Sequence, residues 1–277
     1  MHKSSIKTVC LFVLLLIILL FASGCSGSDP ADNGIPSPDS YLRSTVTQNN
    51  LAQIMTEAGI SDTRQTILFD HINQFNTLTD PKPGYDPYEM QDRWNELSPD
   101  FTGYNCRITS FGIFGDYIAI PPTSAVREDM VLFDLTSLSE DPSVLLTEDD
   151  LARFSVLYST VPTTFTKDTS VHAKNLTADW YKRGIRFLSN DKASLITVIF
   201  HETFSEDENY LFVGHTGILF EADDKLVFVE KIAFQEPYCM TEFETRQQLK
   251  DYLITKYDVS YDQPAAPPFV MENDELM

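Results

Sequence analysis

The sequence YLFVGHTGILFEADDKLVFVEKIAFQEP, residues 210–237, decides the fold. Its two long runs of apolar and β-branched residues are separated by a short acidic turn, a pattern that predicts a β-hairpin. With a two-residue turn, Gly217 lies opposite Glu230 and His215 lies opposite Ile232, and a four-residue loop gives the same register. The hairpin therefore predicts which side chains share each face of the sheet.

In this register His215 and Glu230 lie on one face as diagonal neighbours, within side-chain reach of each other. A carboxylate among large apolar side chains must find a partner or accept a proton. His215 is the nearest partner, and an oriented imidazole is typical of a catalytic base. The best upstream nucleophile is Cys106, in GYNCRITSF. The apolar residues on the face of Glu230 are Leu226, Phe228, Ile232 and Phe234.

The spacing of Ile108, Phe111 and Phe114 predicts a buried helix that has Cys106 in its first turn. The free N–H groups at a helix start lower the pKa of a thiol, and the thiolate is the reactive form. Two alternatives stay open. Cys106 could be an inert core residue, because free cysteines are among the most buried residue types. It could also form a disulfide with Cys239 in an exported protein.

The first 24 residues predict a bacterial export signal. Basic residues precede an apolar run over residues 9–22, and the small residues Ser23 and Gly24 come before Cys25. This end resembles a lipobox, in which Cys25 would be lipidated and become the mature N-terminus. A signal-anchor helix is the alternative, but the run is shorter than the roughly 20 residues of a membrane span. We expect a protein anchored by lipid to the cell membrane, on its extracytoplasmic face.

The charge of the chain excludes one class of partner. Cleavage before Cys25 removes two lysines and leaves 18 basic against 41 acidic residues. A nucleic-acid binder needs the opposite sign, and so does adhesion to anionic lipid. Attachment to the membrane must then come from the acyl chains. No CxxC motif or zinc-type cluster of cysteine and histidine is present in the sequence, so we predict no metal and no cofactor.

The rest of the chain predicts one α+β domain over residues 41–260, with helices first and an antiparallel sheet last. Residues 25–40, rich in Ser, Pro, Gly and Asp, predict a flexible tether, and residues 261–277 predict a disordered acidic tail. The expected helices cover about 51–58, 66–78, 87–97, 106–114, 148–158, 176–182 and 245–256, and the expected strands 194–204, 210–222 and 225–235.

Three further histidines are not assigned to the site. His71 falls inside a predicted helix, where a histidine without a ligand motif is usually a surface or packed residue. His172 has no identifiable partner, and His201 is expected at an edge or on the surface. Gln235 and Glu236 are expected to be an ordinary strand end before a proline.

A cysteine at a helix start, a histidine on a strand and a polar residue on the next strand resemble the site of papain-like cysteine hydrolases. Within that group, HTGILFEADDKLVFVEK at residues 215–231 resembles the histidine hairpin of NlpC-type cell-wall hydrolases. The resemblance implies a papain-like fold, with Cys106 as nucleophile, His215 as base and Glu230 as the orienting group. Two positions depart from the NlpC-type pattern. The chain has Asn-Cys-Arg-Ile for Asp-Cys-Ser-Gly, and its third residue is Glu rather than His, Asn or Gln.

The motifs NCR, VGHTG and FVEKIAFQEPY are similar to those of a family of bacterial lipoproteins of unknown function, over most of residues 41–260. If the site is active, the oxyanion is expected at the backbone N–H of Cys106, with a second donor from Tyr104 or Asn105. A lipid anchor implies a position beside peptidoglycan, so a cell-wall peptide or amide bond is the expected substrate. The alternative is a catalytically inactive lipoprotein that binds a wall fragment, peptide or partner protein.

Overall fold

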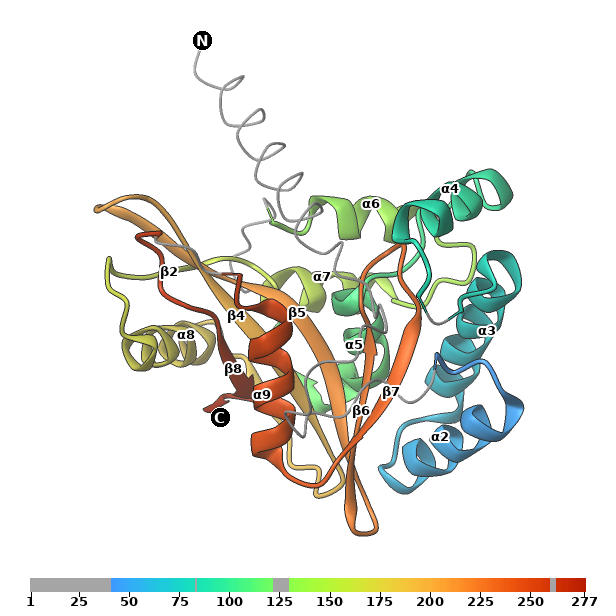
Figure 1. Cartoon of the computed structure of the whole chain (residues 1–277). Coiled ribbons are helices and arrows are strands. Elements are labelled where there is room, and N and C mark those ends of the chain that lie inside the picture. Colours follow the sequence, from blue (N-terminus) through green and yellow to red (C-terminus); the bar gives the residue numbers. More distant parts are fainter. Residues whose placement is uncertain (1–40, 83, 122–129, 260–262) are drawn as a thin grey trace.

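The computed structural model describes residues 41–82, 84–121, 130–259 and 263–277 (Figure 1). The predicted export signal, the tether and the lipidated Cys25 lie outside these residues. The described residues form an α+β fold in which most helices precede an antiparallel sheet, as expected. None of the described helices is both long and apolar enough to cross a membrane.

The helices begin where the sequence offers capping side chains. Asp86 accepts hydrogen bonds from the backbone N–H groups of Tyr88 and Glu89, and Thr147 forms a capping box with Asp150. The described helices are α2 (Thr45–Glu57), α3 (Asp62–Thr79), α4 (Pro87–Leu97), α5 (Cys106–Phe114), α6 (Leu132–Glu140), α7 (Glu148–Leu157), α8 (Thr169–Lys182) and α9 (Arg246–Tyr257), with a 3-10 turn over Gly115–Tyr117.

The main sheet is antiparallel and runs in the order β7-β6-β5-β4-β8-β9, with the short β2 paired to β5. A separate ribbon joins β1 and β3. The strands are β1 (Ile118–Ala119), β2 (Val161–Pro162), β3 (Arg186–Phe187), β4 (Ala193–Ser205), β5 (Glu208–Ala222), β6 (Lys225–Lys231), β7 (Tyr238–Phe243), β8 (Phe269–Glu272) and β9 (Glu275–Leu276).

The β5–β6 hairpin has the predicted register. Ala222 pairs with Lys225 across the turn, and Gly217 pairs with Glu230. The pairing stops there, so the expected partnership of His215 with Ile232 is wrong. The physical reason lies in the next residue, Lys231, whose buried ammonium donates to the carbonyl oxygens of Phe234 and Glu236 and turns the chain away from β5. The first half of β5 therefore extends beyond the end of its neighbour.

The C-terminal residues are not a disordered tail. Strand β8 pairs with β4 and β9 pairs with β8, so the chain ends as two strands of the main sheet. The reason is the run Phe269, Val270 and Met271, whose side chains are all buried. The expectation of disorder came from the surrounding prolines and acids, and three apolar residues in a strand outweigh that composition.

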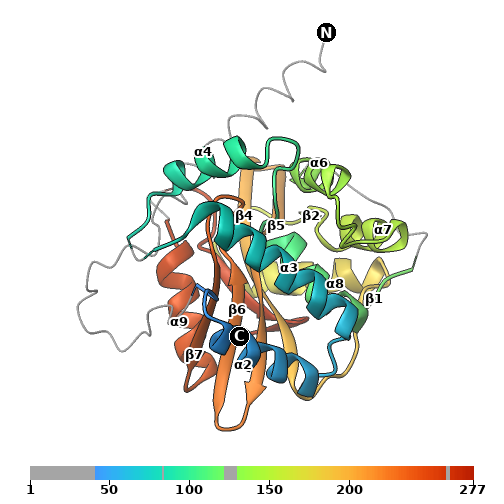
Figure 2. The ribbon, with the colours of Figure 1, turned by 90° about the vertical axis from the view of Figure 1, so that its right-hand side faces the viewer.

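The sheet has a different cover on each face. Figure 2 shows α9 on one side of the strands and α3, α5 and α8 on the other. On the α9 side, Leu249 and Leu253 pack with Leu219, Phe228 and Val270 of the strands in a small apolar cluster. The larger core fills the opposite side. Since both faces are buried, charged side chains on the sheet must find internal partners.

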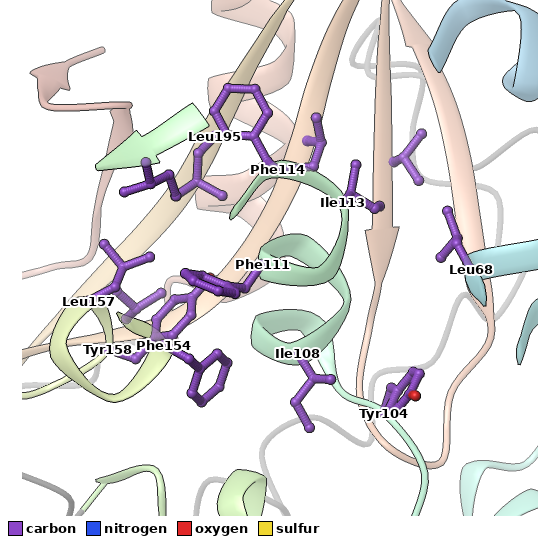
Figure 3. Packing of buried hydrophobic residues seen from close by; sticks show 14 of the residues in the cluster. Leu68, Tyr104, Ile108, Phe111, Ile113, Phe114, Phe154, Leu157, Tyr158 and Leu195 are labelled. Atoms are coloured by element: carbon purple, nitrogen blue, oxygen red, sulfur yellow. The ribbon is translucent and has the colours of Figure 1, made fainter. Parts of the chain in front are cut away.

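Helix α5 lies at the centre of the larger core, as Figure 3 shows. The ring of Phe111 meets those of Phe154 and Tyr158 edge to face, with centroids 5.7 and 6.5 Å apart. All residues of α5 except Arg107 are buried, which is the pattern of a helix surrounded by protein. Helix α5 packs against β5 and β6, so its N-terminus is held rigidly beside the hairpin.

Candidate functional site

Cys106 is the first residue of α5, within the first turn in which the apolar spacing predicted it. Asn105 is the N-cap, and its Oδ1 accepts a hydrogen bond from the backbone N–H of Ile108 at 3.0 Å. The side-chain amide nitrogen of Asn105, Nδ2, donates to Oδ1 of Asp134 at 2.7 Å. The residue before the thiol is therefore fixed by two hydrogen bonds.

The residue after the thiol is fixed by the same carboxylate. Arg107 donates to both oxygens of Asp134, from Nε at 2.9 Å and from Nη2 at 2.7 Å. Its Nη1 donates to the carbonyl oxygen of Val213 at 3.0 Å, on the part of β5 that has no partner in β6. Asp134 is fully buried and stands 27 residues or more from both partners, so its contribution was not visible in the sequence. Asn105 and Arg107, the two neighbours of Cys106 in the NCR motif, are therefore both held in place by Asp134.

His215 and Glu230 lie in contact, as the hairpin register predicted. Nε2 of His215 is 2.7 Å from Oε2 of Glu230, an ion pair in which the N–H is not aligned as a hydrogen bond. Both side chains are buried, at 1% and 0% exposure. The ring of Tyr257 stacks on the imidazole, with centroids 4.5 Å apart and an angle of 20° between the planes. The imidazole is therefore held on its edge and on its face.

The other oxygen of Glu230 is bound by α9. Oε1 accepts a hydrogen bond from the hydroxyl of Tyr252 at 2.5 Å and lies 3.3 Å from Nζ of Lys256. Burial would raise the pKa of Glu230, but Lys256, His215 and Tyr252 together lower it to about 2. These two residues of α9 were not predicted from the sequence. The available signal was their spacing of four residues, which puts both on one helical face.

Cys106 and His215 lie close enough for each to shift the pKa of the other, although neither nitrogen of the imidazole is aligned for a hydrogen bond. Burial raises the pKa of the Cys106 thiol, but the contact with His215 and its charge, with a smaller contribution from Arg107, bring it below its usual value. Burial lowers the pKa of His215, and the contacts with Cys106 and Glu230 raise it above its usual value. These two directions favour a thiolate beside an imidazolium.

At Gly214 and Gly217, the two glycines of the VGHTG motif, neighbouring atoms lie too close to leave room for a side chain. A Cβ on Gly217 would stand 2.7 Å from the carbonyl oxygen of Val229 and closer still to the ring of Phe228. A Cβ on Gly214 would collide with the ring of Phe200. Gly214 is also the extra residue of a β-bulge, because Val198 pairs with His215 and Ile199 pairs with Val213. The bulge sets the face on which the imidazole emerges.

The side chains of Tyr104 and Asn105 have partners elsewhere. The hydroxyl of Tyr104 donates to Asp141 at 2.6 Å and contacts Nε2 of His71 at 2.8 Å, and Asn105 is held by Asp134 and its own helix. Any oxyanion donor from these two residues must therefore be a backbone N–H group.

Cys106 and Cys239 are both free thiols, so the disulfide considered above is not formed. Cys239 lies on β7 directly opposite Glu230 and is fully buried. Within the residues that the structure describes, no group of three or more His, Cys, Asp or Glu side chains is placed to hold a metal ion.

A second buried acid lies near this site. Glu236 is fully buried, and its Oε2 accepts a hydrogen bond from the hydroxyl of Tyr85 at 2.5 Å. The expectation of an ordinary strand end is therefore wrong for Glu236, because the turn set by Lys231 carries it inward. Burial is the main reason that the pKa of Glu236 is raised and that of Lys231 is lowered.

The remaining histidines lie outside the site. His71 is packed, as expected, against Tyr104. The expectations for the other two are wrong. His201 is buried rather than at an edge, because Ala266 and the ring of His172 lie against it, and His172 has hydrogen-bond partners on both ring nitrogens.

The comparison with curated proteins and the comparison with solved structures gave no match to this chain. The comparison with protein families matched one over residues 40–277, a span that includes every residue of the site described above and also the C-terminal strands. The chain belongs to the family described as Domain of unknown function (DUF4300).

Proposed function

We propose that this protein is a thiol hydrolase in which Cys106 is the nucleophile, His215 the base and Glu230 the orienting carboxylate. The observation that carries the proposal is the position of His215, which contacts the thiol and the carboxylate at once. A thiol at a helix start, an imidazole and an ionised carboxylate in this order are the parts needed for acyl transfer.

In the proposed reaction the Cys106 thiolate attacks the carbonyl carbon of an amide, and the oxyanion forms at the N-terminus of α5. The imidazolium of His215 gives its proton to the departing amine as the C–N bond breaks, which leaves a thioester. Neutral His215 then takes a proton from water, whose oxygen attacks the thioester and releases the acid and the thiolate. Glu230 holds the ring and stabilises its charge in both steps.

We also propose a papain-like scaffold and a place at the cell envelope. A buried central helix with the cysteine at its start, packed on an antiparallel hairpin that carries the histidine, supports the scaffold. Membrane attachment through a lipid on Cys25 follows from the N-terminal sequence alone. A domain tethered there meets peptidoglycan, so peptide or amide bonds of the cell wall are the proposed substrates.

A second candidate is a catalytically inactive lipoprotein that binds a wall fragment or peptide on the same scaffold. The burial of the site favours it, since only 6% of Cys106 and about 1% of His215 are exposed. In that case the ion pairs around Glu230 would serve the core alone. The two candidates differ in whether Cys106 can be reached by a reagent or a substrate.

The test compares the parent protein with Cys106→Ala and, as the matched control, Cys239→Ala. Purified peptidoglycan is digested and newly released amino and carboxyl groups are measured by mass spectrometry. We expect Cys106→Ala to lose on the order of a thousandfold or more of the rate and Cys239→Ala to keep most of it.

The same variants also separate the two candidates by alkylation. In the Cys239→Ala background, a reactive Cys106 reacts with iodoacetamide at neutral pH faster than a free thiol does. If the thiol is inert and the parent and Cys106→Ala digest peptidoglycan equally, the hydrolase proposal is rejected and the binding protein is the better candidate.

A further inference from the structure

Two histidines outside the site stand against each other. His172 of α8 and His201 of β4 have ring centroids 4.3 Å apart, with 43° between the planes. They are 0% and 6% exposed. We call them the histidine pair. Two imidazoles at this separation cannot both take up a proton without strong repulsion, so their surroundings decide which form the fold accepts.

The hydrogen bonds of His172 fit its neutral form. Nε2 lies 2.9 Å from the carbonyl oxygen of Thr166, which can only accept, so Nε2 carries the proton. Nδ1 lies 2.8 Å from the hydroxyl of Thr163. That hydroxyl already accepts a hydrogen bond from Asn175 at 2.9 Å, so its own hydrogen is free to point at Nδ1. His172 thus has one donor and one acceptor nitrogen.

The hydrogen bonds of His201 require the neutral form more directly. Nδ1 accepts a hydrogen bond from the backbone N–H of Ala266 at 2.9 Å, so this nitrogen carries no proton. Nε2 lies 3.2 Å from Oδ1 of Asn209 and is the donor. A proton added to Nδ1 would face the N–H of Ala266 and break that contact.

The pair holds the end of the chain. Ala266 lies three residues before β8, and its N–H is fixed by His201. The ring of Phe269, the first residue of β8, lies nearly parallel to that of His172, at 6.4 Å and 12°. Strand β8 is otherwise paired with only four residues of β4 and with the two-residue β9. The C-terminal segment, residues 263–277, is therefore held in part through His201, whose Nδ1 must stay unprotonated, beside the ring of His172.

The charged groups around the pair do not compensate. Asp168, the N-cap of α8, is the carboxylate whose field acts on His172, and it faces solvent. No charged side chain acts on His201 among the described residues, apart from its partner imidazole. Burial lowers the pKa of both histidines below the usual 6.5. After release of the segment they would titrate near 6.5, so attachment is strongest above that pH and weakens as the pH falls below it.

We propose that the histidine pair is an acid-sensitive contact that keeps the C-terminal segment on the sheet and releases it when either ring is protonated. Strand β8 shares its apolar cluster with α9 through Val270, and α9 supplies Tyr252 and Lys256 to Glu230. Release in acid therefore also loosens the support of the Cys106 site, a consequence that rests on the proposed function.

Amide hydrogen exchange tests the proposal without an activity assay. The full chain is labelled at pH 7.0 and pH 5.0, and protection is corrected for the intrinsic exchange rate. Peptides from residues 263–277 should lose at least about tenfold in protection at pH 5.0, relative to peptides of the β5–β6 hairpin. One histidine allows a loss of up to about twenty-fivefold over this interval.

Three variants test which histidine causes the pH dependence of protection. His201→Asn places an amide oxygen near the position of Nδ1, where it can accept from Ala266 but cannot titrate, and His172→Asn removes the other ring. His201→Asn should abolish most of the pH dependence and His172→Asn part of it. His71→Asn, which replaces a buried histidine outside the pair, should leave the pH dependence unchanged. Unchanged protection of the parent segment at pH 5.0, or equal loss in all three variants, would overturn the proposal.

Discussion

The carboxylate of Glu230 is bound from three directions, and its chemistry follows from them. Its oxygens contact His215, Tyr252 and Lys256, and every one of these contacts favours the ionised form. An ionised carboxylate stabilises an imidazolium more than a neutral amide does. Glutamate, rather than a neutral amide, at this position therefore fits a site that keeps its histidine charged.

We predict that Glu230→Gln destabilises the protein by roughly 3 kcal/mol at neutral pH. The pKa of Glu230 is about 2 in the fold against 4.5 when unperturbed, so its contribution is present above pH 4.5 and is lost as the pH falls toward 2. Urea unfolding at pH 7 and pH 3 measures it. The difference between parent and variant should fall to less than half between pH 7 and pH 3, and a difference that does not change with pH would refute the ion-pair account.

Among the elements, helix α9 stabilises the β5–β6 hairpin through its contacts with Glu230. Lys256 is the largest favourable influence on the pKa of Glu230, after burial, which opposes it. Lys256→Met should therefore raise that pKa and move the acid midpoint of unfolding upward by about one pH unit.

Lys250→Met is the matched control for α9. Lys250 lies on the same helix, but its Nζ donates to the carbonyl oxygen of Met277 at 2.6 Å, away from the site. Its acid midpoint, followed by circular dichroism, should stay within a few tenths of a pH unit of the parent value. Equal shifts in both variants would mean that the helix as a whole, rather than its contact with Glu230, sets the midpoint.

The elements differ in how far they could be predicted. The hairpin register followed from a short turn and from the alternation of apolar residues, both of which are local. The helix that begins at Cys106 followed from the spacing of Ile108, Phe111 and Phe114. Asp134, Tyr252 and Lys256 could not be found in this way, because each reaches the site from an element whose docking depends on tertiary packing. The residues placed by local patterns, on the hairpin and on α5, were predictable from the sequence. The residues that stabilise them from distant elements were not.

On the scale of the whole molecule, the sheet is completed by the last residues of the chain. Phe269, Val270 and Met271 bury their side chains on both faces, and full burial of one such side chain contributes about 1.5–3 kcal/mol. Their sum is comparable to the total stability of a domain, about 5–15 kcal/mol. A chain that ends at residue 262 should therefore unfold much more readily than the full chain.

Thermal unfolding followed by circular dichroism checks this expectation. The full chain should give a cooperative transition, and the shortened chain a transition at a clearly lower temperature. A midpoint within a few degrees of the parent value would show that β8 and β9 contribute little. The expectation of a disordered tail failed for the same reason. Composition averages over a window, whereas three apolar residues in register with β4 are enough to form a strand.

The three parts of the Cys106 site lie far apart along the chain. The sulfur comes from α5, the imidazole and its carboxylate from the β5–β6 hairpin, and the lysine that keeps the carboxylate ionised from α9. An unfolded chain has an ordinary thiol, because the pKa of Cys106 is lowered only when His215 and Arg107 lie beside it. The ionisation of this one sulfur therefore reports whether α5 has docked on the hairpin.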